Sequence, residues 1–193
     1  MWTTCVTSAL LGAGSVLLLV ALARRLASKS AALFAGILFG TNLFYSFFTR
    51  QGQLDVAYIF FLLLSTYGWA IWSEGGRRVQ GLGLIAIGTC GAFMSKILVG
   101  FYVPLILLLV QAVGMRHRWR WRGLIEMSAA IAAGVVLALP WHEFMYLRHG
   151  RRFLDAFLGL HLVQRFSAPI EGHDPALGTF FYINQLLVRY PES

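Results

Sequence analysis

Residues 79–115 read VQGLGLIAIGTCGAFMSKILVGFYVPLILLLVQAVGM, an apolar stretch whose one charged residue is Lys96. As a single helix this stretch would be about 55 Å long, nearly twice the hydrocarbon thickness of a bilayer. The sequence therefore predicts two membrane spans that turn at Ser95-Lys96. The same argument divides residues 31–72 at the polar turn Thr49-Arg50-Gln51-Gly52-Gln53.

The rest of the chain repeats this pattern of apolar runs and short polar gaps. Of its 193 residues 58% are hydrophobic and 12% are charged, and the mean hydropathy is +0.69. These values exclude an ordinary soluble domain. We predict an all-α polytopic membrane protein with about six transmembrane helices and an amphipathic interfacial helix on its outer face. The six spans are expected near residues 3–23, 31–48, 56–72, 79–94, 97–115 and 123–141.

Basic residues concentrate in alternate gaps between these runs. Three of the gaps hold nine Arg and Lys residues, and the other two hold only Arg50 and Lys96. Because short cytoplasmic loops accumulate Lys and Arg, the nine-residue set is predicted to face the cytoplasm. Arg50, Asp55, Lys96 and the polar tail after Trp141 then share the outer face. The nine inner residues are Arg24, Arg25, Lys29, Arg77, Arg78, Arg116, Arg118, Arg120 and Arg122.

The basic and aromatic run RHRWRWR at residues 116–122 has the composition of a single-strand nucleic-acid binder. A cytoplasmic loop held at the headgroups by Trp and anionic lipid explains it more simply, so we predict membrane lipid and no nucleic acid as a partner. His142-Glu143 does not continue into a zinc-binding His-Glu-x-x-His motif, because position 146 is Tyr.

Three segments follow from the apolar pattern. Residues 1–141 are the predicted transmembrane bundle, residues 142–175 an outer-face interfacial helix and loop, and residues 176–193 the start of a truncated further span. Within the second segment, residues 151–166 are expected to form the interfacial helix. His161 and Arg165 are four residues apart, so their side chains leave the same face of that helix.

The first span has no basic residue before it and Arg24-Arg25 after it, the reverse of a secretory signal peptide. This pattern predicts an N-terminus outside the cytoplasm and, with the short final apolar run, a fragment of a larger membrane protein. The oligomeric state is not indicated by the sequence.

Several short motifs carry a family resemblance through their order, spacing and shared sidedness. They resemble the GT-C membrane glycosyltransferases of the protein O-mannosyltransferase and lipid A aminoarabinose transferase type. The resemblance implies transfer of a sugar, with inversion, from a polyprenyl-phosphate carrier to an acceptor at the outer face of a plasma membrane such as the bacterial inner membrane. The motifs are Asp55 after an Arg-containing turn, Ser95-Lys96 opening a span, Pro140-Trp141 closing one, His161-x-x-x-Arg165-Phe166 and Glu171-Gly172-His173.

In that family a carboxylate in the first outer loop acts as the base, and by the resemblance this loop lies before Met1. The catalytic residue is therefore unknown, and the chain alone is expected to be inactive. The sequence also departs from the family's usual Thr-Lys-Gly, since it has Ser95-Lys96-Ile97.

Cationic side chains are the natural partners of a phosphate leaving group, because they offset the charge that develops on it. We predict that the phosphate of the donor is bound by Lys96, Arg165, His161 and Arg50. Asp55 is expected to orient Arg50 or Lys96, and Glu171 and His173 are supporting candidates. His161 is also a candidate ligand for a divalent metal ion.

Other interpretations remain open. Lys96 and Arg50 are equally typical of turn residues that extend to the headgroups, and His161 and Arg165 of the polar edge of an interfacial helix. A transporter piece or a non-catalytic scaffold subunit is the alternative class. A transporter would be expected to carry charge within its spans, but no predicted span has an ionisable residue near its middle.

Overall fold

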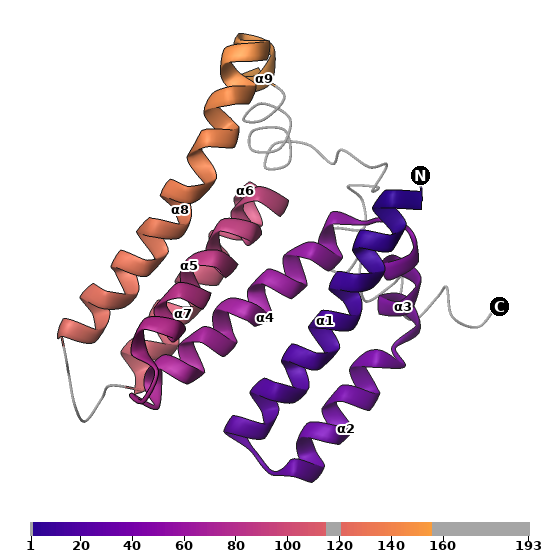
Figure 1. Ribbon diagram of the computed structural model, residues 1–193, viewed down its shortest axis with the longest axis vertical. Helices are drawn as coiled ribbons and strands as arrows, with labels where there is room; N and C mark the ends of the chain where they lie inside the picture. The colour runs from indigo at the N-terminus through magenta and orange to yellow at the C-terminus, as the bar shows by residue number, and fades with distance from the viewer. Residues whose placement is uncertain (1, 115–120, 156–193) are drawn as a thin grey trace, which may run out of the picture. The chain divides into compact units, whose positions relative to one another are not determined.

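The computed structural model describes residues 2–114 and 121–155, and over these ranges the secondary structure is entirely helical. The chain divides into two compact units, Met1–Glu143 and Phe144–Ser193. The predicted all-α class is thus confirmed for the described residues (Figure 1). The helices are α1 (Trp2–Leu26), α2 (Lys29–Gly40), α3 (Leu43–Arg50), α4 (Leu54–Ser73), α5 (Arg78–Ser95), α6 (Ile97–Gly100), α7 (Tyr102–Gly114), α8 (Trp121–His149) and α9 (Arg151–Leu154).

Three helices are long and apolar enough to cross a membrane. They are Thr3–Leu26 in α1, Leu54–Ser73 in α4 and Trp121–His149 in α8. The bent pair α2 and α3 makes a fourth if it is counted as one span. Leu10 and Leu17 of α1 are among the many large apolar side chains that remain exposed, as expected of a surface that faces lipid. Three of the six predicted spans therefore correspond to described helices that could cross a membrane by their length and composition.

The predicted turn at Ser95-Lys96 is confirmed. Helix α5 ends at Ser95, α6 begins at Ile97, and Lys96 between them is extended with φ −150° and ψ 99°. The following apolar run is not one helix, however, because it breaks again at Phe101. Pro104 explains this second break, since a proline ring clashes with the carbonyl four residues earlier, here that of Gly100.

A bend that the sequence analysis did not predict divides residues 31–48. Helices α2 and α3 meet at 58° around Thr41-Asn42. The Asn42 side chain accepts a hydrogen bond from the Tyr45 backbone N–H at 3.0 Å, which caps α3 and starts a new helix there. The apolar pattern continues across this cap, so hydropathy alone does not reveal it.

Helix α8 continues past its predicted end at residue 141, through Pro140, and ends at His149. Gly150, with φ +56°, follows it, and α9 then begins at Arg151. Most of the predicted helix over residues 151–166 lies outside the described residues, so the interfacial helix stays a prediction.

Within the first unit, the chain reverses direction at alternate ends of the bundle, between α1 and α2, between α3 and α4, between α4 and α5, and around α6 (Figure 1). We call the end with the turn at residues 51–53 and Lys96 the Lys96 end, and the end with the turn at residues 74–77 the Arg77 end. The ion pair Arg25–Glu74 joins α1 to α4 at the Arg77 end. Every described member of the predicted inner set therefore lies at the Arg77 end, and Arg50, Asp55 and Lys96 lie at the other.

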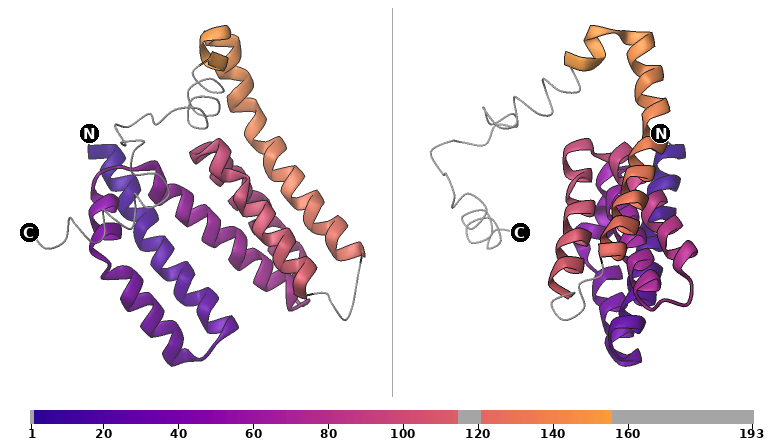
Figure 2. Two further views of the ribbon diagram at one scale, coloured as in Figure 1. Left: turned by 180° about the vertical axis from the view of Figure 1, so that it is seen from behind. Right: turned by 90° about the vertical axis from the view of Figure 1, so that its left-hand side faces the viewer.

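The core of the first unit is built around α4 and α5, which pack against each other in the bundle that Figure 2 shows from two further sides. Glycine allows their close approach. A Cβ added to Gly68 of α4 would lie 2.8 Å from the carbonyl oxygen of Gly81, and one added to Gly81 of α5 would lie 2.7 Å from the backbone nitrogen of Trp72. Small residues commonly permit such contacts between membrane helices, where no water is available to drive association.

Candidate functional site

The Lys96 end brings two of the predicted site residues together. Lys96 Nζ donates to Asp55 Oδ1 at 2.5 Å, across the space between the α5–α6 break and the first turn of α4. The two side chains are 30% and 51% exposed, so both are accessible from outside the bundle. Asp55 also suits the first turn of a helix, where the dipole favours a negative charge. The expected contact of Asp55 with Lys96 is thus present.

Tyr58 makes a second contact between α4 and the chain at the α5–α6 break, and the sequence analysis did not predict it. Its hydroxyl donates to the carbonyl oxygen of Val99 in α6 at 3.0 Å. Tyr58 lies three residues after Asp55, so both side chains leave the same face of α4. This spacing is the signal that could have identified it. Helix α4 therefore contacts the chain at the break, through Lys96, and just after it, through Val99.

Tyr58→Phe removes the hydrogen bond to Val99 without removing any charge, so Lys96 is expected to be held less firmly in place. A single hydrogen bond contributes about 0.5–1.5 kcal/mol, so the protein should remain folded. Reaction of Lys96 with an amine-specific reagent, followed by mass spectrometry of the labelled peptide, should become faster than in the unchanged protein. Tyr102→Phe is a suitable control, because Tyr102 is exposed and follows the break. An unchanged labelling rate would show that the Tyr58 hydroxyl does not position Lys96.

Arg50 is at the same end but is not joined to this pair. It is the last residue of α3 and is exposed. Among the ion pairs between described residues, none involves Arg50. Of the two cationic partners expected for Asp55, the structure thus shows contact with Lys96.

A cavity of about 250 Å³ lies beside the turn that follows Arg50. Ser8, which is 6% exposed, contributes to its wall, and Ser8 Oγ has no hydrogen-bond partner among the described residues. Gly52, with φ +69°, allows the turn to pass close to α1, where an added Cβ would lie 3.2 Å from Thr4 Cβ. The polar residues that line the cavity are Thr3, Thr4, Thr7, Ser8 and Gln53.

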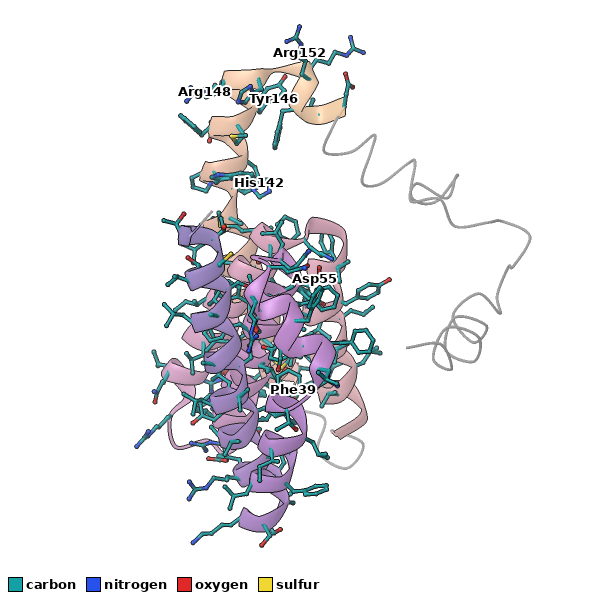
Figure 3. All side chains as sticks on the ribbon, turned by 90° about the vertical axis from the view of Figure 1, so that its right-hand side faces the viewer. Phe39, Asp55, His142, Tyr146, Arg148 and Arg152 are labelled. Atoms are coloured by element: carbon teal, nitrogen blue, oxygen red, sulfur yellow. The ribbon has the colours of Figure 1, made fainter. Side chains whose placement is uncertain are left out.

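His142 of α8 is also at the Lys96 end of the first unit, as is Asp55 (Figure 3). Its Nδ1 donates to the carbonyl oxygen of Ala138 at 2.8 Å, and its ring lies 5.9 Å from that of Phe93. Phe93 lies in α5, three residues before Lys96, so α8 contacts α5 about one turn before the break. Across residues 2–114 and 121–155, no three His, Cys, Asp or Glu residues gather as a metal site would require.

The remaining predicted site residues are not placed. His161, Arg165, Glu171 and His173 lie outside the described residues, so their proximity to Lys96 stays a prediction. The metal-binding role suggested for His161 stays a prediction for the same reason.

The geometry so far is that of an all-helical membrane protein with an accessible ion pair at one end. Residues 1–142 match the profile of one protein family, and the match identifies the class as a membrane glycosyltransferase of the GT-C type. The chain belongs to the family described as dolichyl-phosphate-mannose-protein mannosyltransferase. The matched range contains Arg50, Asp55 and Lys96. No curated protein and no solved structure matches the chain.

Proposed function

We propose that this glycosyltransferase moves a sugar from a polyprenyl-phosphate carrier to a lipid, glycan or protein acceptor, with inversion, at the extracytoplasmic face of a bacterial inner membrane. The observation that carries the proposal is the Asp55–Lys96 pair, which holds an accessible ammonium group at the less basic end of the bundle. The resemblance of the chain to the GT-C family supports the same donor class.

In the proposed reaction the bond between the anomeric carbon and the phosphate oxygen breaks, and a bond to the acceptor oxygen forms on the opposite face of the sugar. The acceptor proton passes to a base that is not assigned in this chain. Negative charge develops on the departing phosphate, and Lys96 is fixed in position to offset it. Arg165, His161 and Arg50 are proposed as further partners of that phosphate, with Glu171 and His173 in support. A divalent cation bound by His161 is proposed as a cofactor.

The proposed architecture has six spans and an outer interfacial helix, in which the bent pair α2–α3, helix α5 and the pair α6–α7 supply the other three spans. A transporter-like role is less well supported. The four ion pairs between described residues lie at or near helix ends rather than within the spans. A non-catalytic scaffold remains distinguishable by experiment, because it predicts no turnover.

The donor class can be tested on the full-length gene product purified from its own membrane. We expect release of polyprenyl phosphate from polyprenyl-phosphate sugars when a panel of lipid, glycan and peptide acceptors is supplied. Nucleotide sugars should give no transfer under the same conditions. Transfer from nucleotide sugars instead would contradict the proposed donor, and no turnover with either class would favour the scaffold.

The proposed orientation predicts a labelling pattern. In a background without Cys5 and Cys90, single cysteines at Gln53 and Gly172 should react with an impermeant thiol reagent in intact cells. Cysteines at Gly76 and His117 should react only after permeabilisation, because the basic loops are expected inside. Labelling of the Gly76 variant in intact cells would show that the proposed orientation is wrong.

A further inference from the structure

The Arg77 end carries more positive charge than its own carboxylates neutralise. Six described cationic side chains lie there with two carboxylates, Glu74 and Glu126, which leaves four formal positive charges in excess. The six are Arg24, Arg25, Lys29, Arg77, Arg78 and Arg122.

Both carboxylates are already engaged. Glu126 Oε2 accepts from Arg78 at 2.5 Å, and Glu126 Oε1 accepts from Arg122 at 3.1 Å. Glu126 Oε2 also accepts from the indole N–H of Trp72 at 3.1 Å. Glu74 pairs with Arg25, whose guanidinium also lies 5.2 Å from the centre of the Tyr67 ring. The ion pairs between described residues therefore leave Arg24, Lys29 and Arg77 without a carboxylate partner.

One of these three, Arg77, lines an open pocket of about 360 Å³ together with Arg25, Glu74, Gly76 and Ile71. The pocket is formed by the ends of α1 and α4 and by the turn that leads to α5. The turn leaves room for a ligand, since a Cβ added at Gly75 or Gly76 would meet nothing within 4 Å. Two arginines and a single glutamate thus line a space that is larger than one phosphate group.

Guanidinium groups bind phosphate oxygens through paired N–H donors, so a phosphate suits this pocket. Its position favours a lipid over a soluble anion. The pocket lies at the ends of two apolar helices, α1 and α4, which are both long enough to cross the membrane. The buried side chain of Ile71 supplies an apolar part of its wall.

We propose that this pocket binds the phosphate of an anionic phospholipid headgroup, with Arg77 as the main ligand and Arg25 as the second. Glu74 competes with the phosphate for Arg25. The site is distinct from the Lys96 end and does not depend on the sugar-transfer reaction. Anionic lipid would thereby neutralise charge that the protein leaves unpaired at this end.

The test is lipid binding by the purified full-length protein in detergent, titrated with phosphatidylglycerol and followed by native mass spectrometry. Arg77→Ala is expected to weaken binding about tenfold, as loss of a charge-assisted hydrogen bond does. Because Arg77 is exposed and pairs with no described carboxylate, this change should leave the fold intact. Glu74→Gln should strengthen binding, since Arg25 then becomes available to the phosphate.

Arg24→Ala is the matched control. It removes the same charge from the same end, but Arg24 does not line the pocket. Its effect should be much smaller than that of Arg77→Ala. Equal losses in the two variants, or weaker binding in Glu74→Gln, would contradict the proposed pocket. Anionic lipid would then be attracted by the overall positive charge of the Arg77 end.

Two further titrations decide the ligand. Phosphatidylcholine should bind much more weakly than phosphatidylglycerol. Soluble glycerol 3-phosphate should not compete at comparable concentration, and if it does, the pocket is a general anion site and the lipid proposal is overturned.

Discussion

Lys96→Ala is expected to lower the rate of sugar transfer by about 10²–10³-fold, the usual cost of losing one preorganised charge partner at such a site. The ammonium group has three donor hydrogens, and Asp55 accepts one of them at 2.5 Å. The remaining donors are available to the donor phosphate. The measurement is the initial rate of transfer by the full-length enzyme from a polyprenyl-phosphate sugar.

Companion variants separate the roles of the site residues. Asp55→Asn keeps an acceptor near Lys96 but removes the charge, so its loss of rate should be smaller than that of Lys96→Ala. Arg165→Ala and His161→Ala should each be as damaging as Lys96→Ala. Arg165→Lys should restore only part of the rate, because a planar fork of donors becomes a point charge. Arg24→Ala, at the opposite end of the bundle, should transfer sugar at nearly the normal rate.

Near-normal turnover in all three alanine variants would contradict the proposed phosphate site. Lys96 would then be a turn residue that extends to the headgroups, and its contact with Asp55 would be structural. An exposed ion pair contributes only about 0–1 kcal/mol to stability, so in that case the Asp55–Lys96 pair would have little measurable effect at all.

The second large effect is expected in the core. Gly81→Ala should lower the free energy of unfolding by about 1–3 kcal/mol, because overpacking forces backbone shifts. The added Cβ would lie 2.7 Å from both the Trp72 backbone nitrogen and the Gly68 carbonyl oxygen, neither of which can move as a flexible side chain could. The change is measured by unfolding the purified protein in mixed micelles with increasing SDS.

Gly83→Ala is the control for the helix itself. It lies two residues further along α5, and a Cβ there would meet nothing within 4 Å. Alanine favours a helix over glycine by about 0.5–1 kcal/mol, so Gly83→Ala should leave the stability unchanged or raise it. If Gly81→Ala were equally harmless, the close packing of α4 on α5 would not contribute to stability.

The features that could be predicted from the sequence are those that follow from length and charge. The turn at Ser95-Lys96 was predictable because a helix through it would be too long for a bilayer. The common end of Arg50, Asp55 and Lys96 followed from the placement of basic residues in alternate gaps. The i,i+4 pair Arg122–Glu126 was predictable from spacing and is present at 3.1 Å.

Other features depend on contacts that no single stretch of sequence reveals. The cap at Asn42 bends an apolar run whose hydropathy does not change, and α8 continues through Pro140 although a proline usually marks a helix end. Glu126 also binds Trp72 and Arg78 from two other helices. The tie from Tyr58 to Val99 joins residues 41 positions apart, so it appears only once α4 and α6 are side by side.

The contacts of α4 limit how the protein can move. Asp55 and Tyr58 fasten one end of α4 to the α5–α6 break, and Trp72 and Glu74 fasten the other to α8 and α1. A helix of 20 residues is about 30 Å long, so these attachments act near opposite membrane surfaces. Rotation or sliding of α4 would therefore break contacts at both of its ends. Any displacement of α6 away from α4 would also break the hydrogen bond from Tyr58 to Val99.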